Sequence, residues 1–123
     1  MVVKKAATTK RPASVRIGPH TYAIKYDDAT VHAAAIELDQ SIAGFSDHHE
    51  HVIGLPVKGY AESALRGILV HEILHCVLAL SASWYKAVEQ GKEVEESMIQ
   101  SSAQLLLGVI RDNPAVVAYL TED

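Results

Sequence analysis

The stretch GILVHEILHCVLAL, residues 67–80, decides how this chain of 123 residues is interpreted. Its apolar residues recur too densely for a helix with a single buried side. The stretch therefore predicts a helix over residues 61–80 that is buried around most of its circumference. Three polar side chains, His71, Glu72 and His75, interrupt the apolar run. Burying them costs free energy unless each finds a partner, so the sequence predicts a site on this helix.

The spacing of these three residues predicts a metal site. Residues four apart on an α-helix lie on the same face, so the imidazoles of His71 and His75 can converge on one point. Neutral imidazole nitrogens bind Zn²⁺ at about 2.0–2.1 Å. Glu72 lies about 100° around the helix from His71, where its carboxylate can take a proton from a water acidified by zinc. H-E-x-x-H on a helix is the signature of zinc metalloproteases.

A catalytic zinc site needs a third protein ligand and an open fourth position. The downstream candidates are Glu89, Glu93, Glu95 and Glu96. The last two stand in the first turns of a second predicted long helix, residues 93–111. Wheel geometry favours Glu95, although the helix dipole favours a glutamate in a first turn without any metal. The pattern of residues leaves Glu95 and Glu96 both open.

The remaining apolar runs predict two β-hairpins. Residues 15–17 and 22–26 flank a Gly-Pro-His turn, and the second run alternates apolar and polar side chains. Further along, SDHHE at residues 46–50 lies between short apolar runs, so residues 52–55 are expected to form the second strand of another hairpin. Pro56 is expected to end that strand or to place it at a sheet edge.

Two further helical segments are expected. Residues 28–39 carry apolar side chains at helical spacing, with Asp27 or Asp28 as the capping residue. Pro114 follows the second long helix, and residues 115–120 predict a last short helical turn.

Composition and charge narrow the class of protein. A net charge of −4 and a pI of about 5.9 argue against a general nucleic-acid binder, which carries a basic face. Basic residues gather at the start, where residues 1–13 are expected to form a flexible tail before a single domain at residues 14–123. Cys76 is the one cysteine, which excludes an intrachain disulfide and is expected to be a small buried side chain. No run of about 18 consecutive apolar residues is present, so a cytoplasmic protein without a membrane span is expected.

At the level of families, the chain resembles the small zincin-like metallopeptidases encoded by phages and prophages. LVHEILHCVL at residues 69–78 and EESMIQSSAQLLLGVIRDNP at residues 95–114 carry the resemblance, which covers about residues 15–120. These proteins are related in pattern to the ImmA/IrrE-type and SprT-like zincins. They share the gluzincin plan of H-E-x-x-H and a downstream glutamate.

The resemblance implies a fold and a ligand set. The fold would be a compact α+β zincin, with a small, mostly antiparallel sheet packed on two long helices. Its edge strand, here residues 51–56, would bind an extended substrate by strand addition. In such families the third ligand is followed by a small or apolar residue at +3 and alanine at +7. Ile99 and Ala103 meet this for Glu96, which the resemblance therefore favours over Glu95.

The resemblance also implies an activity and a cofactor. The activity would be zinc-dependent hydrolysis of a peptide bond in a protein or peptide, with Zn²⁺ on His71, His75 and Glu96 and with Glu72 as general base. Because gluzincins usually add a Tyr or His that steadies the oxyanion, four candidates arise: Tyr60, Tyr85, Tyr119 and His20. If the chain is phage-encoded, the compartment would be the host cytoplasm.

Three alternatives stay open at this stage. The chain could be a catalytically idle zincin-fold module that binds or regulates a partner and keeps a structural metal. It could be a SprT-like, DNA-associated protease, which the acidic balance disfavours. Residues 47–51, DHHEH, could hold a second metal, although a polar turn fits the expected hairpin better. No feature of the sequence indicates an oligomeric state.

Overall fold

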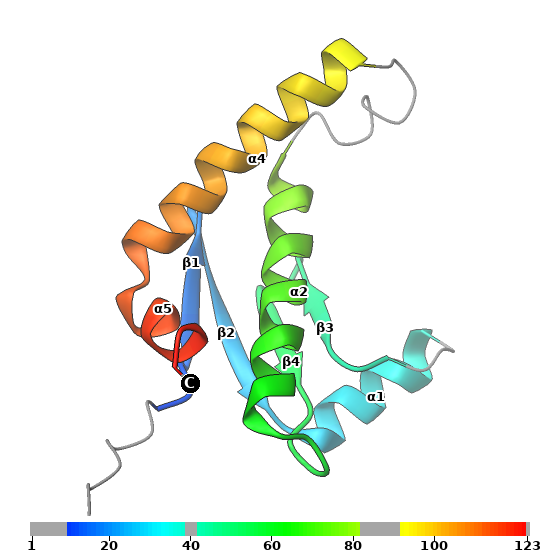
Figure 1. The fold of residues 1–123 in the computed structure, drawn as a ribbon. Helices are drawn as coiled ribbons and strands as arrows, with labels where there is room; N and C mark the ends of the chain where they lie inside the picture. The colour runs from blue at the N-terminus through cyan, green and yellow to red at the C-terminus, as the bar shows by residue number, and fades with distance from the viewer. Residues whose placement is uncertain (1–9, 39–41, 82–91, 123) are drawn as a thin grey trace, which may run out of the picture.

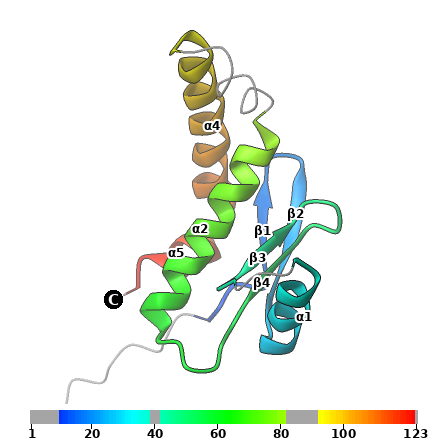
Figure 2. The ribbon, with the colours of Figure 1, turned by 90° about the vertical axis from the view of Figure 1, so that its right-hand side faces the viewer.

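A computed structural model of the chain describes residues 10–38, 42–81 and 92–122, shown in Figure 1. Within these ranges the fold is α+β, as the sequence predicted, with four helices and one four-stranded sheet. Figure 2 shows the helix α2 (Glu62–Leu80) lying across one face of the sheet, with α1 (Asp28–Leu38) away from α2, on the other side of the strand β4 (Val52–Leu55).

The sheet is mixed and has the strand order β1-β2-β4-β3. The strands β1 (Ser14–Ile17) and β2 (His20–Tyr26) form one antiparallel hairpin, and β3 (Phe45–Asp47) and β4 (Val52–Leu55) form the other. Both predicted hairpins are therefore confirmed. The strands β2 and β4 are parallel, with Ile24 opposite Ile53.

The prediction that residues 51–56 form the edge strand is wrong. The helix α1 (Asp28–Leu38) carries the chain from the end of β2 back to the start of the second hairpin, as a parallel pair requires. This connection places β4 beside β2, so β3 lies at the edge instead. Asp27 caps the start of α1, since its carboxylate accepts hydrogen bonds from the amide of Ala29 at 3.1 Å and the hydroxyl of Thr30 at 2.6 Å.

The helix α2 (Glu62–Leu80) covers the sheet with one face only. Its fully buried apolar side chains include Leu69 and Val77, which pack on the apolar face of the sheet. Val70 and Leu74, in contrast, are 40% and 42% exposed. The expectation of burial around most of the circumference is therefore wrong. The cause is that α4 (Lys92–Asp112) and α5 (Pro114–Leu120) cover only part of the outer side of α2, with α4 inclined to it in Figure 1.

By length and mean hydropathy, α2 qualifies as a helix that could cross a bilayer. Core helices of soluble proteins meet the same criterion. Here the apolar stretch is interrupted by His71, Glu72 and His75, and its buried face packs on a sheet.

Two junctions tie the ends of the chain to this core. Residues 1–9 of the expected tail lie outside the described residues, but Pro12 is buried and its carbonyl accepts a hydrogen bond from Tyr26 at 2.8 Å. At the other end, the side chain of Asn113 accepts a hydrogen bond from the Arg16 amide at 2.7 Å. It also donates to the carbonyls of Arg16 and Val109, each at 2.8 Å. The turn between α4 and α5 is thereby fixed to β1.

Candidate functional site

His71 and His75 converge as their spacing predicted. Their Nε2 atoms lie 3.1 Å apart on the exposed side of α2, and the two rings meet edge to face. Two nitrogens that each lie about 2.0–2.1 Å from one tetrahedral zinc ion would be about 3.3 Å apart. The donor pair therefore fits a zinc ion without rearrangement of the helix.

Glu72 lies beside this pair but is 5% exposed. The hydroxyl of Ser46, on the edge strand β3, donates to Glu72 Oε1 at 2.7 Å and lies 3.2 Å from the Glu72 carbonyl. Gly44, just before β3, lets the chain lie this close to α2, because a Cβ on residue 44 would stand 2.9 Å from both the Gly54 carbonyl oxygen and Ile68 Cγ2. The buried carboxylate thus has the polar partner that its position in an apolar helix demands.

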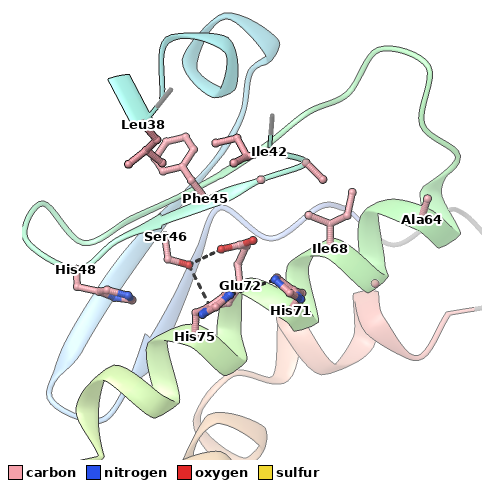
Figure 3. Close-up of a pocket in the computed structure, with 13 residues that line it drawn as sticks. Leu38, Ile42, Phe45, Ser46, His48, Ala64, Ile68, His71, Glu72 and His75 are labelled. Atoms are coloured by element: carbon pink, nitrogen blue, oxygen red, sulfur yellow. Dashed lines mark hydrogen bonds between the residues drawn. The ribbon is translucent and has the colours of Figure 1, made fainter. Parts of the chain in front are cut away.

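A cavity of about 640 Å³ opens where α2 meets β3. Figure 3 shows Glu72, His71 and His75 at one part of its wall, with Ser46 beside Glu72. Volumes of this size are typical of ligand-binding clefts. The three residues that the sequence singled out therefore share one cavity.

His48 is a further residue of this cavity, which sequence reasoning placed in a polar turn with a second metal site as the alternative. It follows β3, and its Nδ1 lies 3.1 Å from the hydroxyl of Tyr22, a fully buried residue of β2. Burial lowers the pKa of His48, and the nearby His75 lowers it further. Burial raises the pKa of Tyr22 to about 12, so the phenol keeps its proton at neutral pH. The DHHEH pattern was the available signal, but it did not indicate which histidine lines the cavity, and His48 is itself an exposed residue.

Cys76 is buried behind the same wall, as expected. Burial raises the pKa of its thiol to about 11, although hydrogen bonds with Ser46 and Tyr22 oppose the shift. Cys76 is not among the residues that line the cavity, so we assign it a packing role.

The third-ligand prediction is neither confirmed nor excluded. Glu96 is exposed on α4, and the side chain of Glu95 lies outside the described part of the chain. Among the residues that the structure describes, no three His, Cys, Asp or Glu side chains form a group that could hold one ion. Glu96 stays a prediction, and His71 and His75 are the two donors brought together.

The expected oxyanion residues lie elsewhere in the described ranges. The hydroxyl of Tyr119 donates to Glu62 at 2.6 Å, Tyr60 is 41% exposed outside the cavity, and the ring of His20 stacks on His51 at 4.3 Å. Tyr85 falls outside the described residues. His48 is thus the described side chain best placed to donate a hydrogen bond into the cavity from the wall opposite α2.

Comparisons with protein-family models, with curated proteins and with solved structures find no match for this chain. Its function therefore has to be argued from the site.

Proposed function

We propose that the protein is a zinc-dependent peptidase. One observation carries the proposal: two imidazole Nε2 atoms 3.1 Å apart share a cavity with a buried carboxylate on the next residue of the same helix. A structural metal site has no use for that carboxylate, whereas hydrolysis needs a general base there.

His71 and His75 would hold the metal, with Glu96 as the proposed third ligand. Zinc bound there would supply a Lewis acid and a water of lowered pKa. Glu72 would take a proton from that water and later pass it to the leaving amine. The Ser46 hydroxyl donates a hydrogen bond to Oε1 of Glu72. This hydrogen bond orients the carboxylate and leaves Oε2 to receive the transferred proton.

His48 would bind the carbonyl oxygen of the scissile peptide. The Tyr22 hydroxyl lies 3.1 Å from His48 Nδ1, and the proposal requires the tautomer in which Tyr22 is the donor and the proton of the neutral imidazole is on Nε2. Figure 3 shows the ring of His48 extending toward the cavity from the side opposite α2. A donor fixed in this way stabilises the negative charge that develops on the oxygen during hydrolysis.

The open edge of β3 would hold the substrate. Within the described part of the chain β3 is the outermost strand and no strand pairs with its outer edge, and Phe45 and Ser46 of β3 line the cavity. An extended peptide added to this edge would run beside Glu72.

The test compares Glu72→Gln with wild type in a proteomic cleavage screen, with and without a chelator. Glu72→Gln is expected to keep its zinc and lose cleavage, whereas Glu50→Gln, a change in the exposed β3–β4 turn, is expected to keep both. Full cleavage by Glu72→Gln would refute the assigned chemistry. If the wild-type protein keeps its zinc but cleaves no substrate in the screen, the catalytically idle binding module is favoured.

A further inference from the structure

The cavity beside Glu72 is polar at one end and apolar at the other. Its polar lining residues are those of the candidate site, with Ser46 hydrogen-bonded to Glu72. The opposite end is walled by Ile68 and Ala64 on α2 and by Ile42, which precedes β3, as Figure 3 shows. Among the lining residues that the structure describes, Glu72 is the one carboxylate and none is a lysine or arginine. A charged group at the apolar end would therefore lose its hydration without gaining a partner.

The space at the apolar end depends on small residues of α2. Gly67 stands one turn before His71 and so lies on the same face of the helix. A Cβ built at Gly67 would meet no atom within 4 Å, so open space lies beside its backbone. Ala64 lines the cavity a further turn back and adds only a methyl group.

From this arrangement we infer that the cavity selects a large apolar side chain, that of leucine, isoleucine, methionine or phenylalanine, from an extended peptide, and that Gly67 sets the permitted size. The inference rests on the proposed function, because the selected residue would adjoin the bond presented to Glu72. The backbone edge of β3 recognises any sequence, so the apolar end would supply the selectivity.

The expected selectivity follows from the area that becomes buried. Each methylene removed from water improves binding about fourfold. Leucine has three more carbons than alanine, which gives about sixtyfold for complete burial. Because the cavity is open to solvent, we expect a peptide with leucine to bind about tenfold more tightly than the same peptide with alanine.

The experiment measures binding, so it does not depend on cleavage. A library of random displayed nonapeptides is selected on Glu72→Gln protein, once loaded with zinc and once metal-free. The dissociation constants of one selected peptide and its alanine variant are then measured by calorimetry. Gly67→Leu and the control Ala79→Leu, an exposed position of α2 outside the cavity, are made in the same background. Leucine is a better helix former than glycine, so Gly67→Leu should fold, and Ala64→Leu provides a second filled cavity.

The inference predicts that one peptide position is enriched in large apolar residues. It also predicts that Gly67→Leu and Ala64→Leu shift that position to glycine, alanine or serine, while Ala79→Leu does not. Enrichment of charged or small residues on the parent protein, no enrichment, or an unchanged preference in Gly67→Leu would overturn it. If enrichment is found but wild type cleaves none of the selected peptides, the proposed peptidase fails and the apolar selectivity stands. If wild type cleaves peptides without such a preference, the proposed peptidase stands and the apolar selectivity fails.

Discussion

The hydrogen bond between Ser46 and Glu72 gives a prediction that needs neither metal nor substrate. Glu72 is 5% exposed, and the Ser46 hydroxyl donates to its carboxylate at 2.7 Å. Hydrogen bonds to charged groups contribute about 1.5–3 kcal/mol to stability. Ser46→Ala should therefore lower the free energy of unfolding of the metal-free protein by about 2 kcal/mol. For a chain of this length, the melting temperature should fall by about 8 °C.

A double-mutant cycle assigns this loss to the pair. In a Glu72→Ala background the Ser46 hydroxyl keeps its backbone contact with residue 72, at 3.2 Å in the wild type. Ser46→Ala should then cost only about 0.5 kcal/mol, which gives a coupling energy of about 1.5 kcal/mol. The assay is urea unfolding in the presence of a chelator, and Ser63→Ala, an exposed position of α2, is the control that should change little. Equal losses in both backgrounds, or no loss from Ser46→Ala alone, would refute the reasoning.

Three further predictions concern other parts of the molecule. Asn113→Ala removes three hydrogen bonds and should lower the free energy of unfolding by about 3 kcal/mol in urea; an unchanged midpoint would contradict the proposed attachment of the α4–α5 turn to β1. Hydrogen bonding from Arg11 lowers the pKa of Glu62 from its ordinary value of 4.5, so this group stabilises the fold above pH 4.5 and loses that contribution as the pH falls below it. Glu62→Gln should flatten the acid-side decline in unfolding free energy, and an identical decline in both proteins would be evidence against the ion pair. For cleavage, His48→Ala should lower kcat about 100-fold on a substrate from the screen while His49→Ala in the same turn does not; similar kcat values for both variants would remove His48 from the site.

The sequence predicted those features that depend on local spacing. His71 and His75 meet because residues four apart on a helix always share a face, and the two hairpins form around polar turns. The buried state of Glu72 also followed from its apolar surroundings in the sequence. Each of these depends on neighbours within a few residues along the chain.

The features that the sequence did not predict depend on contacts between distant segments. The pairing of β2 with β4 joins segments that are far apart in the sequence. It makes β3 the edge strand and brings Ser46 within hydrogen-bond distance of Glu72. The same strand pairing brings the Tyr22 hydroxyl next to the ring of His48. Their separation along the sequence gives no sign of this contact. The exposure of Leu74 depends on the inclination of α4, which hydrophobic periodicity does not encode.

Zinc binding by His71 and His75 is the central claim, and it is tested most directly by titrating the metal-free protein with Zn²⁺ under calorimetry. The account predicts one tightly bound ion per chain in wild type and in His49→Gln, and loss of that ion in His71→Gln and in His75→Gln. Absence of tight binding by wild type, or unchanged binding by both α2 variants, would contradict it.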